Sequence, residues 1–180
     1  MKIIGLTGFP LSGKDTVAQY LVTKSFKMLS AGDIIRTAMR AEGLRLDRAS
    51  IQAYVTRQRA LRGDAYVDEE MLPHITGNTV ISAFREMAGV DFFRKKFPGD
   101  FILLEVAAPI ELRYARAQMR QREGDIISLD EFKAQETYEL SAPGYSMQQV
   151  LDAADARIEN SGSEVDLFKQ LDIILEKYGI

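Results

Sequence analysis

Cysteine is absent from this chain of 180 residues, and histidine occurs only once, at His74. Without cysteine, the protein can form no disulfide bond, no cysteine-ligated metal site and no thiolate nucleophile. This absence fits a reducing compartment, and we interpret His74, next to Pro73 at a helix end, as a structural residue. The chemistry of the protein must therefore depend on carboxylates, hydroxyls, lysine, arginine and backbone groups.

Long apolar runs and an excess of positive charge are missing as well. No segment approaches the roughly 18 apolar residues of a membrane-spanning helix, and the N-terminal MKIIGLTG lacks the longer apolar core of a signal peptide. The formal net charge of −3 disfavours a general nucleic-acid-binding protein, which needs a basic surface. We expect a soluble cytoplasmic monomer or homodimer that binds neither membranes nor nucleic acid.

Short apolar runs alternate along the chain with segments of helical period. A chain of 180 residues, 46% of them hydrophobic, is enough for one sizeable core and predicts a single domain. The runs that we interpret as strands are residues 2–7, 26–29, 78–83, 101–107 and 156–159. This alternation predicts an α/β fold with a mainly parallel five-stranded sheet, helices on both faces, and ligands beyond the carboxyl ends of the strands.

The segment GFPLSGK, residues 8–14, lies between the first predicted strand and the first predicted helix. Glycines let successive backbone N–H groups turn inward, and a helix N-terminus and a lysine favour an anion, so this pattern predicts a phosphate loop. An ordinary glycine-rich turn is the alternative. We predict that a nucleoside triphosphate contacts Gly8, Pro10, Leu11, Ser12, Gly13, Lys14, Asp15 and Thr16.

The segment from Ser30 to Arg36 resembles the Gly-Asp-x-x-Arg segment of adenylate kinase and its relatives. The resemblance implies that Arg36 holds the phosphate of a monophosphate acceptor and that Asp33 approaches a sugar or Mg²⁺. A guanidinium one helical turn from the cap can grip a phosphate bidentately. Arg85, just after the third predicted strand, fits the second acceptor-binding arginine of these kinases.

Two positions depart from the family pattern. Asp15 follows the loop lysine, where a serine or threonine is usual, and Ser82 stands at the end of the third predicted strand, where an aspartate is usual. We hypothesise a swapped Mg²⁺ shell formed by Asp15, Thr16 and Ser82, because a hard cation accepts oxygen ligands from either position. The alternative is a degraded site that binds nucleotide but scarcely turns over.

Arg113, Arg116 and Arg120 lie three and four residues apart on one face of a predicted helix. In the related kinases, arginines of a lid close over the transferring phosphoryl group, and we favour Arg116 and Arg120 for this role. A solvated basic face is the alternative. The segment around Asn160 resembles the C-terminal Ile-x-Asn-x-Gly segment of dephospho-CoA kinases, which implies that this loop packs beside the donor base.

Together, these segments are similar to adenylate-kinase-related proteins, often archaeal, that are also described as dephospho-CoA-kinase-like. The resemblance implies one P-loop NTPase domain, residues 1–180, of the nucleoside monophosphate kinase type. Within it, residues 31–76 would form the acceptor-binding helical region and residues 113–145 the lid. We predict ATP or another nucleoside triphosphate and Mg²⁺ as cofactors. The predicted catalytic residues are Lys14, Arg85, Arg116 and Arg120; Asp33, Arg36 and Arg85 bind the acceptor.

The expected activity is phosphoryl transfer from a nucleoside triphosphate to a nucleoside or deoxynucleoside monophosphate. Two alternatives stay open: a dephospho-CoA kinase that uses Asp33 as base, and a nucleotide-binding regulator with slow hydrolysis. We interpret Asp68, Glu69 and Glu70 as a solvated acidic face. Tyr54, Arg57 and Arg62 lie where weak contacts with the acceptor are expected.

Overall fold

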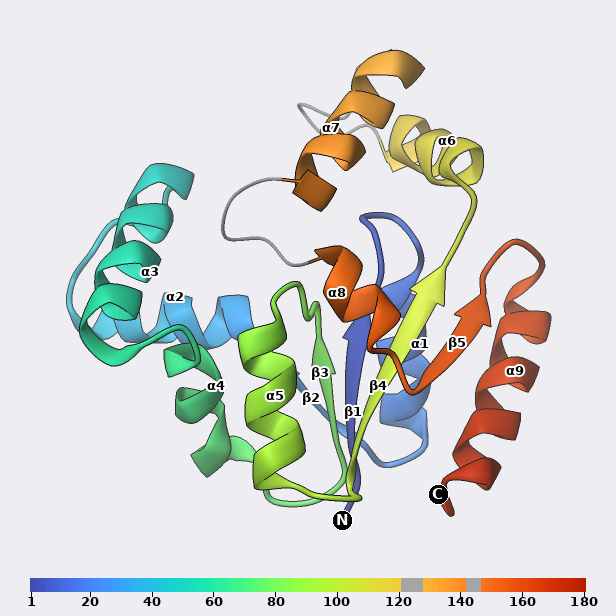
Figure 1. Cartoon of the computed structure of the whole chain (residues 1–180), viewed down its shortest axis with the longest axis horizontal. Coiled ribbons are helices and arrows are strands. Elements are labelled where there is room, and N and C mark those ends of the chain that lie inside the picture. The colour runs from blue at the N-terminus through green and yellow to red at the C-terminus, as the bar shows by residue number, and fades with distance from the viewer. Residues whose placement is uncertain (121–127, 142–146) are drawn as a thin grey trace.

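The computed structural model describes residues 1–120, 128–141 and 147–180 of the chain. Within these ranges, five strands form one sheet in the order β2-β3-β1-β4-β5 (Figure 1). The strands are β1 (Ile3–Thr7), β2 (Lys27–Ser30), β3 (Thr79–Ser82), β4 (Phe101–Ala107) and β5 (Ala156–Glu159). Every pair of neighbours is parallel, so the carboxyl ends of all five strands meet at one edge of the sheet.

Helices follow each strand. They are α1 (Lys14–Thr23), α2 (Ala31–Ala41), α3 (Arg48–Arg62), α4 (Tyr66–Met71) with the 3-10 turn η1 (Leu72–His74), α5 (Met87–Lys96), α6 (Ile110–Arg120), α7 (Leu129–Ser141), α8 (Met147–Asp152) and α9 (Glu164–Lys177). In the described parts of the chain, none of these helices has the length and apolar character needed to cross a membrane.

Two apolar layers enclose the sheet. Successive side chains of a strand point to opposite faces, so Ile4 and Leu6 of β1 pack with α1 and α9, whereas Ile3 packs with α4, α5 and α8. Figure 1 shows α5 and α8 in front of the sheet and α1 behind it, while α6 and α7 lie beyond the carboxyl ends of the strands. The helices therefore cover both faces and leave the carboxyl edge for a ligand.

Gly5 in the middle of β1 admits an aromatic ring to the sheet. A Cβ atom at this position would lie 2.7 Å from the ring of Phe84. Phe84 follows β3 and is tied to β1 by its own N–H, which donates to the carbonyl of Leu6 at 2.9 Å, and by its carbonyl, which accepts from the Thr7 hydroxyl at 2.9 Å. This contact fixes the backbone immediately before Arg85 at the carboxyl edge.

The predicted fold class is confirmed: the sheet is parallel and five-stranded, and helices cover both of its faces. Each predicted strand segment overlaps an observed strand, although β2 ends one residue later than predicted, at Ser30. The division into an acceptor region and a lid stays a prediction. Of the predicted lid, residues 121–127 and 142–145 lie outside the described residues.

Candidate functional site

The predicted phosphate loop connects the carboxyl end of β1 to the N-terminus of α1. Gly8 has a φ of 136°, and a Cβ atom there would lie 2.2 Å from the carbonyl oxygen of Val106, so only glycine fits. The Lys14 ammonium donates to the carbonyl oxygens of Gly8 at 2.8 Å and Phe9 at 2.7 Å. The loop therefore wraps around its own lysine, which lies at the first position of α1.

The N-terminus of α1 faces the loop. Its N-cap residue is Gly13, with a φ of 100°, and no side chain in the described part of the chain caps this terminus. The first N–H groups of a helix have no acceptor within the helix and, together with the helix dipole, attract anions. This geometry is that of a phosphate-binding helix terminus, as the glycine pattern predicted.

Asn160, just after β5, contacts the loop from across the sheet. Its side-chain amide donates to the carbonyl oxygen of Ser12 at 2.8 Å, and the side chain is buried. Arg116 on α6 donates to the carbonyl oxygens of Leu11 at 3.1 Å and Asn160 at 3.0 Å. Burial lowers the pKa of Arg116. These bonds bring together residues that the sequence placed in three separate segments.

A cavity of about 540 Å³, the phosphate-loop cavity, opens beside these residues. It is lined by the loop and α1, by two residues after β3, by α6 and by the segment after β5: Pro10, Leu11, Gly13, Lys14, Asp15, Thr16, Ala83, Arg85, Arg116, Arg120, Asn160, Gly162, Glu164 and Leu167. Arg120 and Arg85 thus face the same space as Lys14. The predicted donor residues Gly8 and Ser12 do not line this cavity, and within the described ranges the buried Ser12 hydroxyl has no hydrogen-bond partner.

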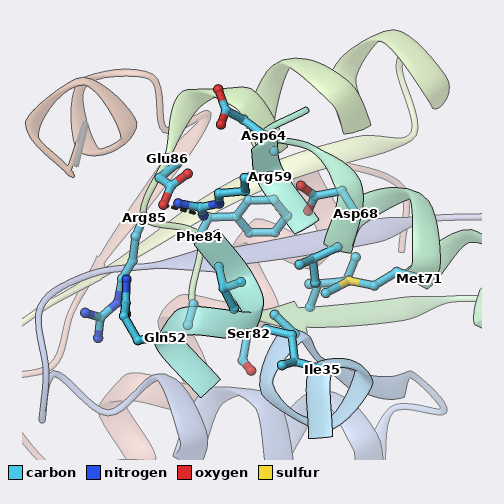
Figure 2. Close-up of a pocket in the computed structure, with 16 residues that line it drawn as sticks. Ile35, Gln52, Arg59, Asp64, Asp68, Met71, Ser82, Phe84, Arg85 and Glu86 are labelled. Atoms are coloured by element: carbon cyan, nitrogen blue, oxygen red, sulfur yellow. Dashed lines mark hydrogen bonds and ion pairs between the residues drawn. The ribbon is translucent and has the colours of Figure 1, made fainter. Parts of the chain in front are cut away.

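A second cavity, of about 260 Å³, lies between the sheet and the helices α2 to α5 (Figure 2). We call it the adjacent cavity. Its apolar walls are Ala31, Ile35, Val55, Val67, Met71, Ile81, Phe84 and Gly89, and its polar lining consists of Gln52, Arg59, Asp64, Asp68, Ser82, Arg85 and Glu86. Arg85 and Ala83 line both cavities, so the segment after β3 forms the boundary between them.

The boundary segment adopts an uncommon backbone conformation. Ala83 has a φ of 73°, in the left-handed region that favours glycine. The chain adopts this conformation with an alanine, whose Cβ atom makes it less favourable than for glycine. The turn directs Arg85 to where the two cavities meet.

Charged groups that the sequence analysis missed lie in the adjacent cavity. Arg59 of α3 donates to the carboxylate of Glu86 at 2.7 Å, as the dashed line in Figure 2 marks. Gln52, Val55 and Arg59 follow the i, i+3, i+7 spacing of one helix face, which is the sequence signal that could have identified Arg59.

The expectation that Asp68 belongs to a solvated face is wrong. Glu69 and Glu70 are exposed, but the Asp68 carboxyl lines the adjacent cavity. Burial, and then the charge of Glu86, raises the pKa of Asp68 to about 7. Its carboxyl group is therefore divided between the neutral and ionised forms near neutral pH.

The predicted acceptor residues Asp33 and Arg36 contact each other. The Arg36 guanidinium donates to the Asp33 carboxylate at 2.6 Å and thereby lowers the pKa of Asp33. The Asp33 side chain is largely exposed and that of Arg36 is partly exposed, and the adjacent cavity is lined by other residues of α2. The contact of Asp33 and Arg36 with an acceptor stays a prediction.

The three predicted metal ligands are divided between the cavities. Asp15, which is exposed, and Thr16 line the phosphate-loop cavity, whereas Ser82 lines the adjacent one next to the boundary residue Ala83. Within the described ranges, no group of three or more histidine, cysteine, aspartate or glutamate side chains is arranged to hold a metal ion. The carboxylate of Asp15 and the hydroxyl groups of Thr16 and Ser82 are too few to surround a metal ion, so they suit a cation that keeps several water ligands, as Mg²⁺ does.

The three lid arginines differ in their surroundings. Arg113 is buried, with its guanidinium 4.9 Å from the ring centre of Phe9, an ion pair to Glu136 of α7 and a hydrogen bond to the carbonyl of Ala108. It joins the phosphate loop to α7. Arg116 and Arg120, the two arginines that the sequence favoured for the lid role, line the phosphate-loop cavity. Arg113 does not line it.

Comparisons with known proteins agree with this geometry. The family model of the AAA domain (AAA_17) matches residues 7–133. The UPF0200 protein of Methanosarcina mazei is 31% identical over 182 residues, 99% of this chain and 96% of that protein. That of Halobacterium salinarum, OE_4442F, is 36% identical over 172 residues, 91% of this chain and 86% of that protein. The chain spans 56% of the UPF0200/UPF0201 protein of Archaeoglobus fulgidus, with 30% identity.

Solved structures share the whole fold. TT1252 from Thermus thermophilus has a TM-score of 0.63 and 26% identity, covering 98% of this chain and 97% of that one. Shikimate kinase from Aquifex aeolicus has a TM-score of 0.60 and 18% identity, covering 99% and 98%. A gluconokinase from Sinorhizobium meliloti has a TM-score of 0.54 and 12% identity, covering 98% and 94%. The chain therefore has the fold of P-loop small-molecule kinases, and it belongs to the AAA-domain (AAA_17) family and to the UPF0200 proteins.

Proposed function

We propose that this protein is an ATP-dependent phosphotransferase whose acceptor is a small phosphorylated molecule, a nucleoside or deoxynucleoside monophosphate. The observation that carries the proposal is the position of Arg85, which lines both the phosphate-loop cavity and the adjacent cavity. A guanidinium at such a boundary can hold an acceptor phosphate in line with the donor phosphates.

The phosphate-loop cavity is assigned to the donor. A bound nucleoside triphosphate with Mg²⁺ supplies the transferable phosphoryl group. The N–H groups at the start of α1 and the ammonium of Lys14 hold its phosphates. Asp15 and Thr16 are the side chains of this cavity that would hold the metal, with Ser82 beyond the boundary. Asn160 and Arg116 keep the loop in its shape through the carbonyl oxygens of Ser12 and Leu11.

The adjacent cavity is assigned to the acceptor. Phosphoryl transfer depends mainly on positioning and charge stabilisation. Arg85 orients the acceptor phosphate, which is already ionised and needs no strong base. Arg116 and Arg120 face the donor side, where they offset the charge of the transferring group. Arg36 keeps its proposed role as a second phosphate ligand, which requires its exposed and hence weak ion pair with Asp33 to open.

A coupled assay of ADP release across a panel of monophosphates and dephospho-CoA tests the proposal. We expect turnover with at least one monophosphate. Arg85→Ala should lower kcat/KM for the acceptor roughly 100-fold while leaving ATP affinity within a few-fold, because a charge-assisted bidentate contact is lost. Arg45→Ala, at a guanidinium that is 87% exposed, is the matched control and should change neither quantity.

An acceptor hydroxyl is the second candidate, and Asp68 is the observation that favours it. Shikimate kinase and a gluconokinase share the fold, and a buried carboxyl of raised pKa can serve as a general base. Asp33 suits this role less, because its ion pair with Arg36 lowers its pKa. Turnover with dephospho-CoA, shikimate or gluconate alone would overturn the monophosphate assignment. No acceptor-stimulated turnover at all would indicate a nucleotide-binding regulator.

A further inference from the structure

The Asp68 carboxyl is held at a fixed place in the adjacent cavity. A Cβ atom on Gly89 would lie 3.1 Å from both of its oxygens, so the carboxyl rests against the first turn of α5. Arg59, the nearby cation of α3, donates instead to Glu86. The Asp68 carboxyl accepts a hydrogen bond from its own backbone N–H, and among the described residues no side chain donates to it. Its oxygens are therefore able to accept hydrogen bonds from a ligand.

Asp68 and Arg85 lie on opposite sides of this cavity. Figure 2 shows Arg85 at one side and Asp68 with Met71 at the other, and Phe84 between them. Only Arg85 of these residues also faces the phosphate-loop cavity. An acceptor whose phosphate is bound at Arg85 would therefore extend its opposite end, the base of a nucleotide, toward Asp68.

The walls near Asp68 suit a flat, partly apolar ring. Val55, Val67, Met71 and Phe84 supply apolar surface to this cavity, and Asp68 supplies a polar group. A small-molecule site of this kind, apolar with a few placed polar groups, derives its specificity from those polar groups. Asp68 is therefore positioned to distinguish one ring edge from another.

A carboxyl oxygen accepts hydrogen bonds from N–H groups. Adenine, cytosine and guanine each carry an exocyclic amino group. Uracil and thymine carry carbonyl oxygens on either side of a single N–H. An ionised carboxylate that faces those carbonyl oxygens places acceptor against acceptor, so no hydrogen bond forms between them. Leaving buried polar groups unpaired strongly disfavours a ligand.

We propose that Asp68 determines the base specificity of the acceptor, so that the enzyme prefers monophosphates whose base carries an exocyclic amino group over those of uracil and thymine. This inference rests on the proposed function, since it identifies the acceptor class of the same cavity. The ionised form of Asp68 carries only accepting oxygens and is the form that discriminates, whereas the protonated form also has an O–H donor that can pair with a carbonyl oxygen. Because burial raises the pKa of Asp68 to about 7, the base preference is compared above that pH.

The test compares kcat/KM for AMP, CMP, GMP, UMP and dTMP in the full chain and in Asp68→Asn. The asparagine has the same shape and adds an N–H donor that can pair with a carbonyl oxygen. We expect the wild type to prefer amino-bearing bases by roughly 10- to 100-fold and the variant to lose most of that ratio. Glu69→Gln, on the exposed side of the same helix, should keep the wild-type ratio.

The outcomes separate this inference from the proposed function. If the wild type turns over monophosphates but its kcat/KM for UMP or dTMP equals or exceeds that for the amino-bearing bases, the role of Asp68 is overturned while the proposed function stands. An equal loss of kcat/KM for all bases in Asp68→Asn shows a structural role and also overturns it. Absence of turnover with every monophosphate overturns both. If the variant does not fold, the ratio of the wild-type kcat/KM values for amino-bearing bases and for UMP or dTMP still tests the predicted base preference.

Discussion

The side-chain amide of Asn160 donates to the carbonyl oxygen of Ser12 at 2.8 Å, joining positions 148 residues apart in the chain. The same amide nitrogen would lie 2.1 Å from a Cβ atom at Gly13. Two segments at the carboxyl ends of β1 and β5 are thus fitted to each other around the phosphate loop. The contact links the fold of the C-terminal segment to the shape of the nucleotide site.

Removing this hydrogen bond should weaken nucleotide binding. We expect Asn160→Ala to reduce ATP affinity by about 10-fold in calorimetry and the free energy of unfolding by about 1–2 kcal/mol, because the Ser12 carbonyl loses the shorter of its two side-chain hydrogen bonds and keeps only that from Arg116, at 3.4 Å. Asn78→Ala is the matched control. It removes the side chain that accepts from the N–H of Lys2 at 2.9 Å. It should lower stability without changing ATP affinity; equal affinity loss in both variants would contradict the local role of Asn160.

Alanine at Gly13 should abolish detectable nucleotide binding. The backbone there has a φ of 100°, and the new methyl group would collide with the Asn160 amide. Gly43→Ala provides the comparison, since its φ is 68° and its surroundings are open. It should cost only the strain of a left-handed residue, about 1–2 kcal/mol in urea unfolding. Wild-type ATP affinity in Gly13→Ala would refute this account of the loop.

Glycine at position 83 should stabilise the protein. Ala83 has a φ of 73°, which costs about 1 kcal/mol relative to glycine, so Ala83→Gly should raise the free energy of unfolding by about that amount. Ser25→Gly, at a φ of 69° and away from both cavities, tests the same backbone effect. A gain in Ser25→Gly with a loss in Ala83→Gly would show that the Ala83 methyl group contributes more through packing than its backbone strain costs.

Substitution of Asp15 should change the Mg²⁺ requirement. If Asp15 carries the carboxylate of a swapped metal shell, Asp15→Ala should raise the Mg²⁺ concentration for half-maximal activity by about 10-fold, with a smaller effect for Asp15→Ser, which keeps an oxygen. Asp91→Ala, at an exposed aspartate of α5, is the control. Unchanged Mg²⁺ dependence in both Asp15 variants would remove this residue from the metal shell.

Asp68 should make stability depend on pH. Burial raises its pKa in the folded state from 3.8 to about 7, so the folded state retains a proton that the unfolded state releases between these values. The contribution of this carboxyl to the free energy of unfolding is fully present below pH 4 and is lost as the pH rises through 7. Asp68→Asn should therefore be nearly neutral at pH 4 and stabilising by about 1–3 kcal/mol at pH 8 in urea unfolding. The same effect at both pH values would rule out this titration.

Local sequence patterns predicted most of the fold because they are short-range signals. The continuous apolar run of residues 101–107 indicates a strand buried on both faces, the helical period after Lys14 indicates a helix with one buried face, and both elements form as predicted. The glycine spacing of the phosphate loop likewise predicts its conformation, since Gly8 and Gly13 both have the positive φ that such a loop requires. Pattern alone did not identify Asp68, which stands beside two exposed glutamates.

The sequence by itself determined the succession of strands and helices along the chain, the position of the phosphate loop and the arginines available to it. Only the tertiary structure decided which charges share a cavity: it buried Arg113 against Phe9, paired Arg59 with Glu86, and placed Arg85 between two cavities. The physical reason is the distance along the chain over which each kind of interaction acts. Backbone conformation follows from neighbouring residues, whereas the burial of a charge and the partner it meets depend on elements that pack together from distant parts of the chain.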